Sequence, residues 1–187
     1  IYTLSLHDAL PIYKVTVALL VPTMINMVIN HPDAAKFDLT SLQYVLYGAS
    51  PMPEAVVRKA MQVIPGAKFQ QAYGQTEAAP VLTLLEPERH VFDGPLAGKA
   101  TSAGRAIPGV EVAIFDEPAN EVPRGTGGQI VGRGENVMVG YWTQPAVKVT
   151  FSVTLSEAPS DRLCWRMPGN CTLNSVVLSP IGFSLYE

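Results

Sequence analysis

The feature that most constrains this fold is an alternation of strand-like and helix-like segments along residues 15–72. The β-branched and apolar run at 15–21 predicts a buried strand, residues 42–46 predict a second buried strand, and residues 68–72 predict a third strand. A proline stands at the start of each intervening helix-like segment, at Pro22 and Pro53. Strands that alternate with helices pair in parallel through right-handed crossovers, so the sequence predicts an α/β fold.

Apolar spacing gives each predicted helix one apolar face. On the first helix, Met24, Met27 and Val28 share that face. The second helix has Glu54 in its first turn and stops at Pro65. Its apolar stripe is longer and consists of Val56, Val57, Ala60, Met61 and Ile64.

The pattern changes after residue 103. Short β runs at Val110–Phe115 and 129–133 are separated by glycine and proline turns and show no helical period. We therefore divide the central part of the chain into a parallel strand–helix–strand part, 13–103, and a small antiparallel β subdomain, 104–147.

The two terminal segments differ from the rest. Residues 1–12 show no clear period and resemble translated sequencing-adaptor read-through, with an ordinary strand and turn as the alternative, so they are left out of the functional reasoning. Residues 148–187 show no helix pattern and contain both cysteines, Cys164 and Cys171. We interpret them as a divergent tail that is either frameshifted or genuinely β-rich.

Composition argues against several classes of partner. The chain has 13 basic and 16 acidic residues and a net charge of −3, which disfavours binding to nucleic acid or to an anionic membrane surface. No run approaches the roughly 20 apolar residues that a membrane helix needs. Two cysteines make neither a disulfide framework nor a zinc spacing, so we expect a cytoplasmic protein.

The most polar loops of the α/β part follow its second and third strands. They are Gly48-Ala49-Ser50-Pro51 and Tyr73-Gly74-Gln75-Thr76-Glu77. Ligands of parallel sheets bind beyond the carboxyl ends of the strands. A carboxylate such as Glu77 can bind Mg²⁺ together with nucleotide phosphates, and the ring of Tyr73 can stack on a base. The alternatives are a plain strand-to-helix turn at the first loop and a short helix N-capped by Thr76 at the second.

The two histidines near helix ends and loops are not expected to be catalytic. His31 precedes Pro32 and is expected to be a surface cap. His90 lies in a polar loop with no paired acid or nucleophile nearby, and we expect it to face solvent.

Both loops belong to a series of ordered segments: VPTMINMVINHP, LQYVLYGASPMP, FQQAYGQTEAAPVL, AGKATSAGRAIPGVEVAIFD and RGENVMVGYWTQP. Their order and spacing resemble the adenylate-forming acyl-CoA synthetases, also called AMP-binding enzymes, and most of all the fatty-acid–CoA ligases. The resemblance implies ATP, Mg²⁺ and CoA. A carboxylic acid would attack the α-phosphorus of ATP to give acyl-AMP, and the CoA thiol would then displace AMP. The implied partners are small molecules, with no nucleic acid and no integral membrane segment.

The resemblance also implies roles for single residues. The wall on the adenine side would consist of Gly48, Ala49, Ser50, Pro51, Gln71, Ala72 and Tyr73, with Tyr73 stacked on the base. Gly74 and Gln75 would lie between the nucleotide and the acyl group. Thr76 would hydrogen-bond the α-phosphate and Glu77 would bind Mg²⁺, so these two are the candidate catalytic residues. Val21, Pro22 and Tyr47 are candidates near the acyl pocket.

Several features of the family are not found in this sequence. They are the upstream phosphate loop with its lysine, the Thr-Gly-Asp motif expected after Trp142, and the small C-terminal domain with its catalytic lysine. We therefore expect a central fragment of the large domain that is inactive by itself. The alternatives are a non-catalytic nucleotide- or acyl-binding remnant, an amino-acid-adenylating domain of a peptide synthetase, and a luciferase-like oxidase.

Overall fold

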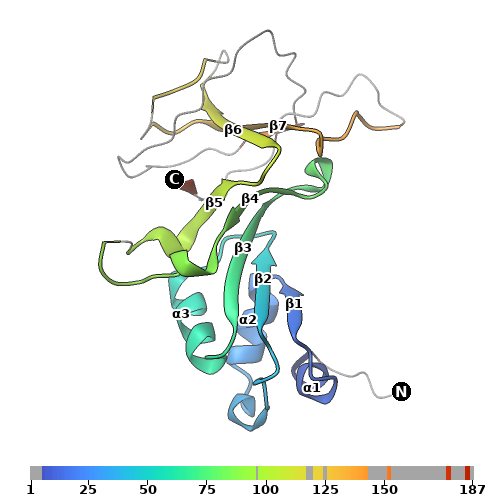
Figure 1. The fold of residues 1–187 in the computed structure, drawn as a ribbon, viewed down its shortest axis with the longest axis vertical. Helices are drawn as coiled ribbons and strands as arrows, with labels where there is room; N and C mark the ends of the chain where they lie inside the picture. The colour runs from blue at the N-terminus through green and yellow to red at the C-terminus, as the bar shows by residue number, and fades with distance from the viewer. Residues whose placement is uncertain are drawn as a thin grey trace. The chain divides into compact units, whose positions relative to one another are not determined.

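Two compact units make up the chain (Figure 1). Unit 1 comprises Ile1–Ala72 and Leu85–Thr101, and unit 2 comprises Tyr73–Leu84 and Ser102–Glu187. The computed structural model describes the following residues: 6–95, 97–116, 120–123, 126–142, 151–152, 176–177 and 184–185. Most of the tail interpreted as divergent, 148–187, therefore lies outside the described residues.

Unit 1 contains the strand–helix alternation that the sequence predicts. Its main elements are α1 Leu6–Ile12, β1 Val17–Leu20, α2 Pro22–Ile29, β2 Tyr44–Gly48, α3 Glu54–Val63 and most of β3 Lys68–Gly74. Short 3-10 helices lie at Ala34–Lys36, Pro87–Arg89 and Lys99–Thr101. β2 pairs in parallel with β1 and with β3. The predicted parallel α/β arrangement is confirmed.

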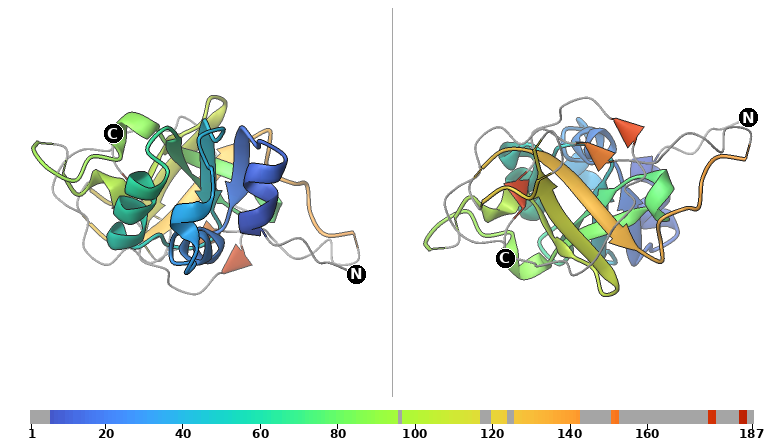
Figure 2. Two further views of the ribbon diagram at one scale, coloured as in Figure 1. Left: turned by 90° about the horizontal axis from the view of Figure 1, so that it is seen from below. Right: turned by 90° about the horizontal axis from the view of Figure 1, so that it is seen from above.

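Helices α2 and α3 cover one face of these strands (Figure 2). Alternate strand residues such as Ala18, Val45 and Phe69 point to that face and are buried. On β1 the opposite face is open, because Val17 and Leu19 are 63% and 73% exposed. The sequence predicts a buried strand here, and the structure buries only one face of it, because its side chains alternate between two faces and the helices cover only one.

The buried face of α2 also differs from the prediction. Ile25, Val28 and Ile29 are buried, whereas Met24 lies at the surface and Met27 is 69% exposed. Val28 belongs to two apolar stripes of this helix, one with the two methionines and one with the two isoleucines. The stripe with the isoleucines faces the strands. The methionine stripe is left on the side away from the core.

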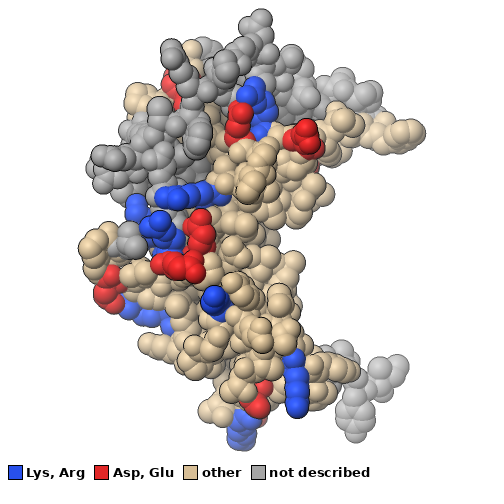
Figure 3. Space-filling model, in the orientation of Figure 1, with Lys and Arg blue, Asp and Glu red and all other residues tan. Residues whose placement is uncertain are grey.

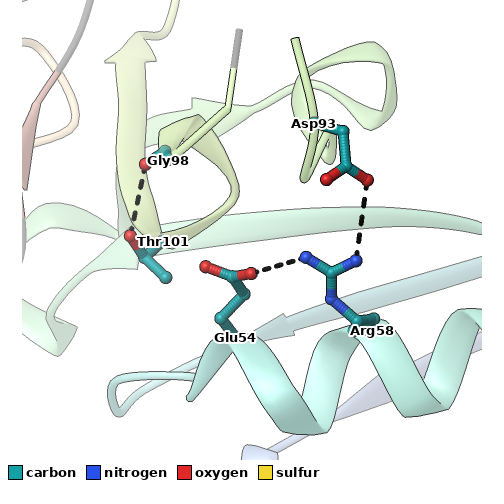
Figure 4. A network of polar contacts seen from close by, with 5 residues as sticks. All are labelled: Glu54, Arg58, Asp93, Gly98 and Thr101. Carbon is teal, nitrogen blue, oxygen red and sulfur yellow. Dashed lines mark hydrogen bonds and ion pairs between the residues drawn. The ribbon is translucent and has the colours of Figure 1, made fainter.

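Helix α3 follows its prediction closely. It begins after Pro53, and the buried residues Val57 and Ala60 belong to the predicted apolar stripe. On its outer side Arg58 lies 2.8 Å from a Glu54 carboxylate oxygen and 3.7 Å from one of Asp93 (Figure 4). Exposed ion pairs of this kind contribute about 0.2–1 kcal/mol each, so they attach the segment around Asp93 to α3 only modestly.

The longer strands of unit 2 form antiparallel pairs. Most of β4 Val81–Leu85 lies in this unit and pairs with β5 Ser102–Ala106, and β6 Val110–Phe115 pairs with β7 Gln129–Gly134 (Figure 2). The antiparallel β subdomain is confirmed, and β4 and β5 add a pair that the sequence analysis did not predict. The core of the unit is formed by Ala78, Leu82, Val110, Val112 and Ile130.

In unit 1 the strand order is β1-β2-β3. In unit 2, β5 lies between β4 and β10 and pairs with β10 in parallel, while β6-β7 and the parallel β8-β9 are separate pairs. The last three strands are very short: β8 Phe151–Ser152, β9 Val176–Val177 and β10 Ser184–Leu185. Within the described part of the chain, no helix combines the length and the apolarity needed to cross a bilayer. Acidic and basic side chains are intermixed on the face drawn in Figure 3.

The environment of His90 corrects the sequence analysis, which expected it to face solvent. His90 is only 4% exposed, and its Nε2 lies 2.8 Å from the hydroxyl of the fully buried Tyr47. Its Nδ1 lies 3.2 Å from the carbonyl oxygen of Glu86. Because a carbonyl only accepts, Nδ1 carries the proton, and Nε2 accepts the hydrogen bond from the tyrosine. Burial is the main cause that lowers the pKa of His90.

The buried His90 predicts a pH dependence of stability. Its pKa in the folded state lies below the ordinary value of 6.5, so the unfolded chain binds the proton more readily. The contribution of His90 to stability should therefore be complete above about pH 6.5 and should be lost as the pH falls. Urea denaturation of the His90→Gln variant at several pH values should show a weaker loss on acidification than the wild type.

The matched control is His31→Gln, which replaces a histidine that is only partly buried. We expect this variant to keep the pH dependence of the wild type. An unchanged acid dependence in His90→Gln would contradict the assignment of a neutral, buried His90.

Candidate functional site

The loop after β2 begins where two strands of unit 1 approach closely. Gly48 is the register partner of Ala72 in the parallel pair. A Cβ atom added to Gly48 would lie 2.2 Å from the carbonyl oxygen of Ala72, which is closer than any side chain allows. Ala49, the next residue, has a φ of +68°, a conformation that costs an alanine about 1–2 kcal/mol. The start of this loop is therefore tightly specified by its backbone.

The same edge of unit 1 carries an unusual buried amide. Gln71 is 1% exposed, and neither polar atom of its carboxamide has a hydrogen-bond partner. It is the register neighbour of Tyr47 on β2. Of the two other residues of the first loop, Ser50 is half-buried and Pro51 is exposed. An unpaired buried amide costs stability, which is the kind of feature found where a ligand is bound.

The second loop lies in unit 2 and starts with another close approach. A Cβ atom on Gly74 would lie 2.0 Å from the carbonyl oxygen of Pro80, so glycine is required at that position too. Burial raises the pKa of the neighbouring Tyr73 to about 12, so its phenol stays neutral. The amide nitrogen of Gln75 is buried without a hydrogen-bond partner. The loop thus contains the aromatic ring of Tyr73 and, on Gln75, an N–H donor without a hydrogen-bond partner among the described residues.

Glu77 lies in a 3-10 turn, Thr76–Ala78, directly after this loop. The residue at the N-cap position is Gln75, and no side chain caps the turn, so the alternative in which Thr76 is an N-cap is not observed. The Thr76 side chain is exposed and Glu77 is half-buried. The carboxylate of Glu77 is therefore accessible to a ligand.

A second segment of unit 2 holds this turn. Met138 N donates to the backbone oxygen of Glu77 at 2.8 Å. The Tyr141 hydroxyl donates to Oε1 of the Glu77 carboxylate. Asn136 Nδ2 donates to the carbonyl oxygens of Ala78 and Val81, at 2.7 and 3.0 Å. The sequence analysis assigned no role to Asn136 or Tyr141, although both lie in the GENVMVGYW segment that it quoted.

The two loops can be tested separately for their fit to a magnesium nucleotide. Mg²⁺ is usually bound through one or two carboxylates, with phosphate oxygens and waters completing its coordination. The accessible Glu77 carboxylate fits that role, and the described residues contain no cluster of three or more acidic, histidine or cysteine side chains. In unit 1, small side chains and an unpaired amide fit a flat polar ring. The structure brings Gly48 together with Ala72, and Glu77 together with Tyr141.

Comparison with known proteins assigns the chain to a family. The family described as AMP-binding enzyme matches residues 3–142. A CoA ligase from Rhodococcus jostii (strain RHA1), specific by name for a methyl-dioxo-octahydroindenyl propanoate, is 39% identical over 141 residues, which cover 75% of this chain and 24% of that protein. The fatty acid–[acyl-carrier-protein] ligase ScoC of Streptomyces coeruleorubidus is 34% identical over 131 residues, with 70% and 24% coverage.

This chain is also similar to a solved structure. The amide bond synthetase McbA from Marinactinospora thermotolerans is 31% identical, with a TM-score of 0.64, over 75% of this chain and 27% of that one. The chain therefore has part of the fold of the large domain of these enzymes. It spans about a quarter of the length of the curated relatives it matches.

The close approach at Gly48 predicts a strong effect of one methyl group. Gly48→Ala should lower the free energy of unfolding by about 1–3 kcal/mol, because the strands must move apart to make room. The control is Gly66→Ala, since an added Cβ there meets nothing within 4 Å. Urea denaturation should separate the two variants clearly. Equal midpoints for Gly48→Ala and the wild type would refute the close packing of β2 on β3.

Proposed function

This chain belongs to the AMP-binding enzyme family, and we propose that it is part of a ligase that activates a carboxylic acid as acyl-AMP and transfers the acyl group to the thiol of CoA. The observation that carries the proposal is the carboxylate of Glu77. It follows the end of β3 and is accessible, and it accepts a hydrogen bond from Tyr141, while the Met138 amide donates to the backbone oxygen of the same residue. An ordered, accessible carboxylate in an AMP-binding enzyme supports a role in holding the magnesium ion of ATP.

The proposed reaction has two steps. In the first, a carboxylate oxygen of the acid forms a bond to the α-phosphorus of ATP, and the bond from that phosphorus to the pyrophosphate oxygen breaks. In the second, the sulfur of CoA attacks the acyl carbon, a thioester forms, AMP leaves and the thiol proton is released. Both steps move negative charge on phosphate oxygens, so positioning and charge neutralisation carry the catalysis. The metal supplies that neutralisation when bound.

The residues of the chain would divide these tasks. The small side chains of the first loop, Gly48, Ala49, Ser50 and Pro51, would accept the adenine side of the nucleotide together with Gln71 and Ala72. Tyr73 would stack on the base, and Gly74 and Gln75 would lie toward the acyl group. The exposed hydroxyl of Thr76 would donate to the α-phosphate, and Glu77 would hold Mg²⁺.

The identity of the acid and of the acceptor are separate parts of the proposal. The relatives named above transfer acyl groups to CoA, to a carrier protein or, in an amide synthetase, into an amide bond, so acid activation is what they have in common. We favour CoA because the Rhodococcus jostii ligase, at 39% identity, is by name a CoA ligase. We favour a fatty acid because of the fatty-acid ligase ScoC.

The first test measures nucleotide binding by the chain as it exists. Calorimetry should show that ATP binds more tightly with Mg²⁺ than with a chelator, and that Glu77→Gln removes this difference. We expect a loss of roughly tenfold in affinity for the magnesium complex, the contribution of about one charge-assisted interaction. The control Glu135→Gln, at an exposed position of the same unit, should behave like the wild type. A magnesium effect that survives in Glu77→Gln would contradict the role of Glu77.

The second test measures the reaction class. The segment matching residues 15–142 would be exchanged into the Rhodococcus jostii ligase, and acid-dependent pyrophosphate exchange would be followed. The chimera should be active, and its Glu77→Gln version should lose about 10²–10³ in rate, the usual effect of removing one preorganised electrostatic group. Circular dichroism would be used to check that both chimeras fold. Equal rates in two folded chimeras would contradict the assignment.

A further inference from the structure

Among the described residues, the hydrogen bonds of Glu77 engage only one of its two carboxylate oxygens. Oε1 accepts the hydrogen bond from the Tyr141 hydroxyl, and Oε2 has none in the described part of the chain. Glu77 and Tyr141 are 64 residues apart in sequence, and both belong to unit 2. The two oxygens of this carboxylate are therefore not equivalent.

The segment that carries Tyr141 is itself anchored to the turn. Asn136 binds two carbonyl oxygens, on either side of the residues Ala79 and Pro80, with its amide nitrogen. The Met138 amide binds the backbone of Glu77, and Val137 and Met138 pack against the core of unit 2. Residues 136–141, here called the clamp segment, thus hold both the backbone and the carboxylate of Glu77.

We propose that the clamp segment restricts Glu77 to one metal-binding oxygen, Oε2, and thereby makes the site favour Mg²⁺ over Ca²⁺. Mg²⁺ requires a compact octahedral shell, in which a carboxylate contributes a single oxygen. Ca²⁺ is larger and accepts a carboxylate through both oxygens. A phenol that donates to Oε1 uses one lone pair of that oxygen and weakens it as a metal ligand, which disfavours the second mode and leaves the first one intact. In this role Tyr141 and Asn136 are positioning residues, because they act through Glu77.

Two features of the contact support an occupied Oε1. The contact joins a phenol O–H, which donates, to a carboxylate oxygen, which only accepts, so Oε1 receives a charge-assisted hydrogen bond. The amide nitrogen of Asn136 faces two acceptors at once, which defines its orientation and resists rotation of the turn.

The metal preference rests on the proposed function, whereas the positioning of Glu77 does not, and the test separates them. ATP affinity would be measured with Mg²⁺ and with Ca²⁺ for the wild type and for Tyr141→Phe, which keeps the ring and removes only the hydroxyl. The ratio of the magnesium to the calcium affinity should fall about tenfold in Tyr141→Phe, because a hydrogen bond to a charged group contributes a free energy that corresponds to about that factor. A merely structural role would change both affinities alike, and an unchanged ratio would overturn the proposal.

Positioning is measured without nucleotide by hydrogen exchange. In Asn136→Ala, amide exchange of Ala78 and Ala79, whose N–H groups bond within the turn, should accelerate roughly tenfold.

The matched control is Thr83→Val, which removes a buried hydrogen bond of the same unit, from the Thr83 hydroxyl to the Ala103 carbonyl oxygen at 2.6 Å. In Thr83→Val, the amide exchange of Ala78 and Ala79 should accelerate no more than the lower global stability of this variant accounts for. Equal acceleration in Thr83→Val and Asn136→Ala would overturn the positioning of Glu77. If the exchange result holds but no ATP complex binds, the proposed function and the metal preference both fail, and the positioning of Glu77 stands.

Discussion

The parallel pairing of β2 with β3 is the constraint on which the rest of the structure depends. It places Gly48 directly beside Ala72, at a distance that leaves no room for a side chain. The first loop must leave the sheet at that point, and the chain continues from Ala72 into the residues that end in Glu77. A glycine, a strained alanine and an unpaired buried glutamine occur together at this edge of unit 1. Such departures from the most stable local choices are typical of functional sites.

The sequence was sufficient for those parts of the fold that depend on local pattern. The order of strands and helices, the span of α3 and the antiparallel pair β6–β7 follow from periodicity and from turn residues. The strand Ser102–Ala106 could not be predicted, because its residues have little β propensity and its pairing with β4 is a tertiary effect. The burial of His90 could not be predicted for a similar reason: its partner Tyr47 is 43 residues away in sequence.

In the candidate site, too, the sequence predicts the local features but not the long-range contacts. The loops at the ends of two strands, and the resemblance that links them, depend on residues close together in sequence. The contacts of Glu77 with Tyr141 and Met138 join segments that are distant in sequence, and no local pattern reports them. The missing information is therefore long-range pairing, which also decides how many oxygens of Glu77 are free.

The central claim is that a metal–nucleotide complex binds next to Glu77. Nuclear magnetic resonance of the full chain with Mn²⁺ and ATP tests it directly, because the paramagnetic ion broadens the signals of nearby amides only. The account predicts that the amides of the turn Thr76–Ala78 lose intensity first, and that Mn²⁺ without ATP has a weaker effect. Broadening that spares this turn while affecting amides elsewhere, or that is identical in Glu77→Gln, would contradict the account.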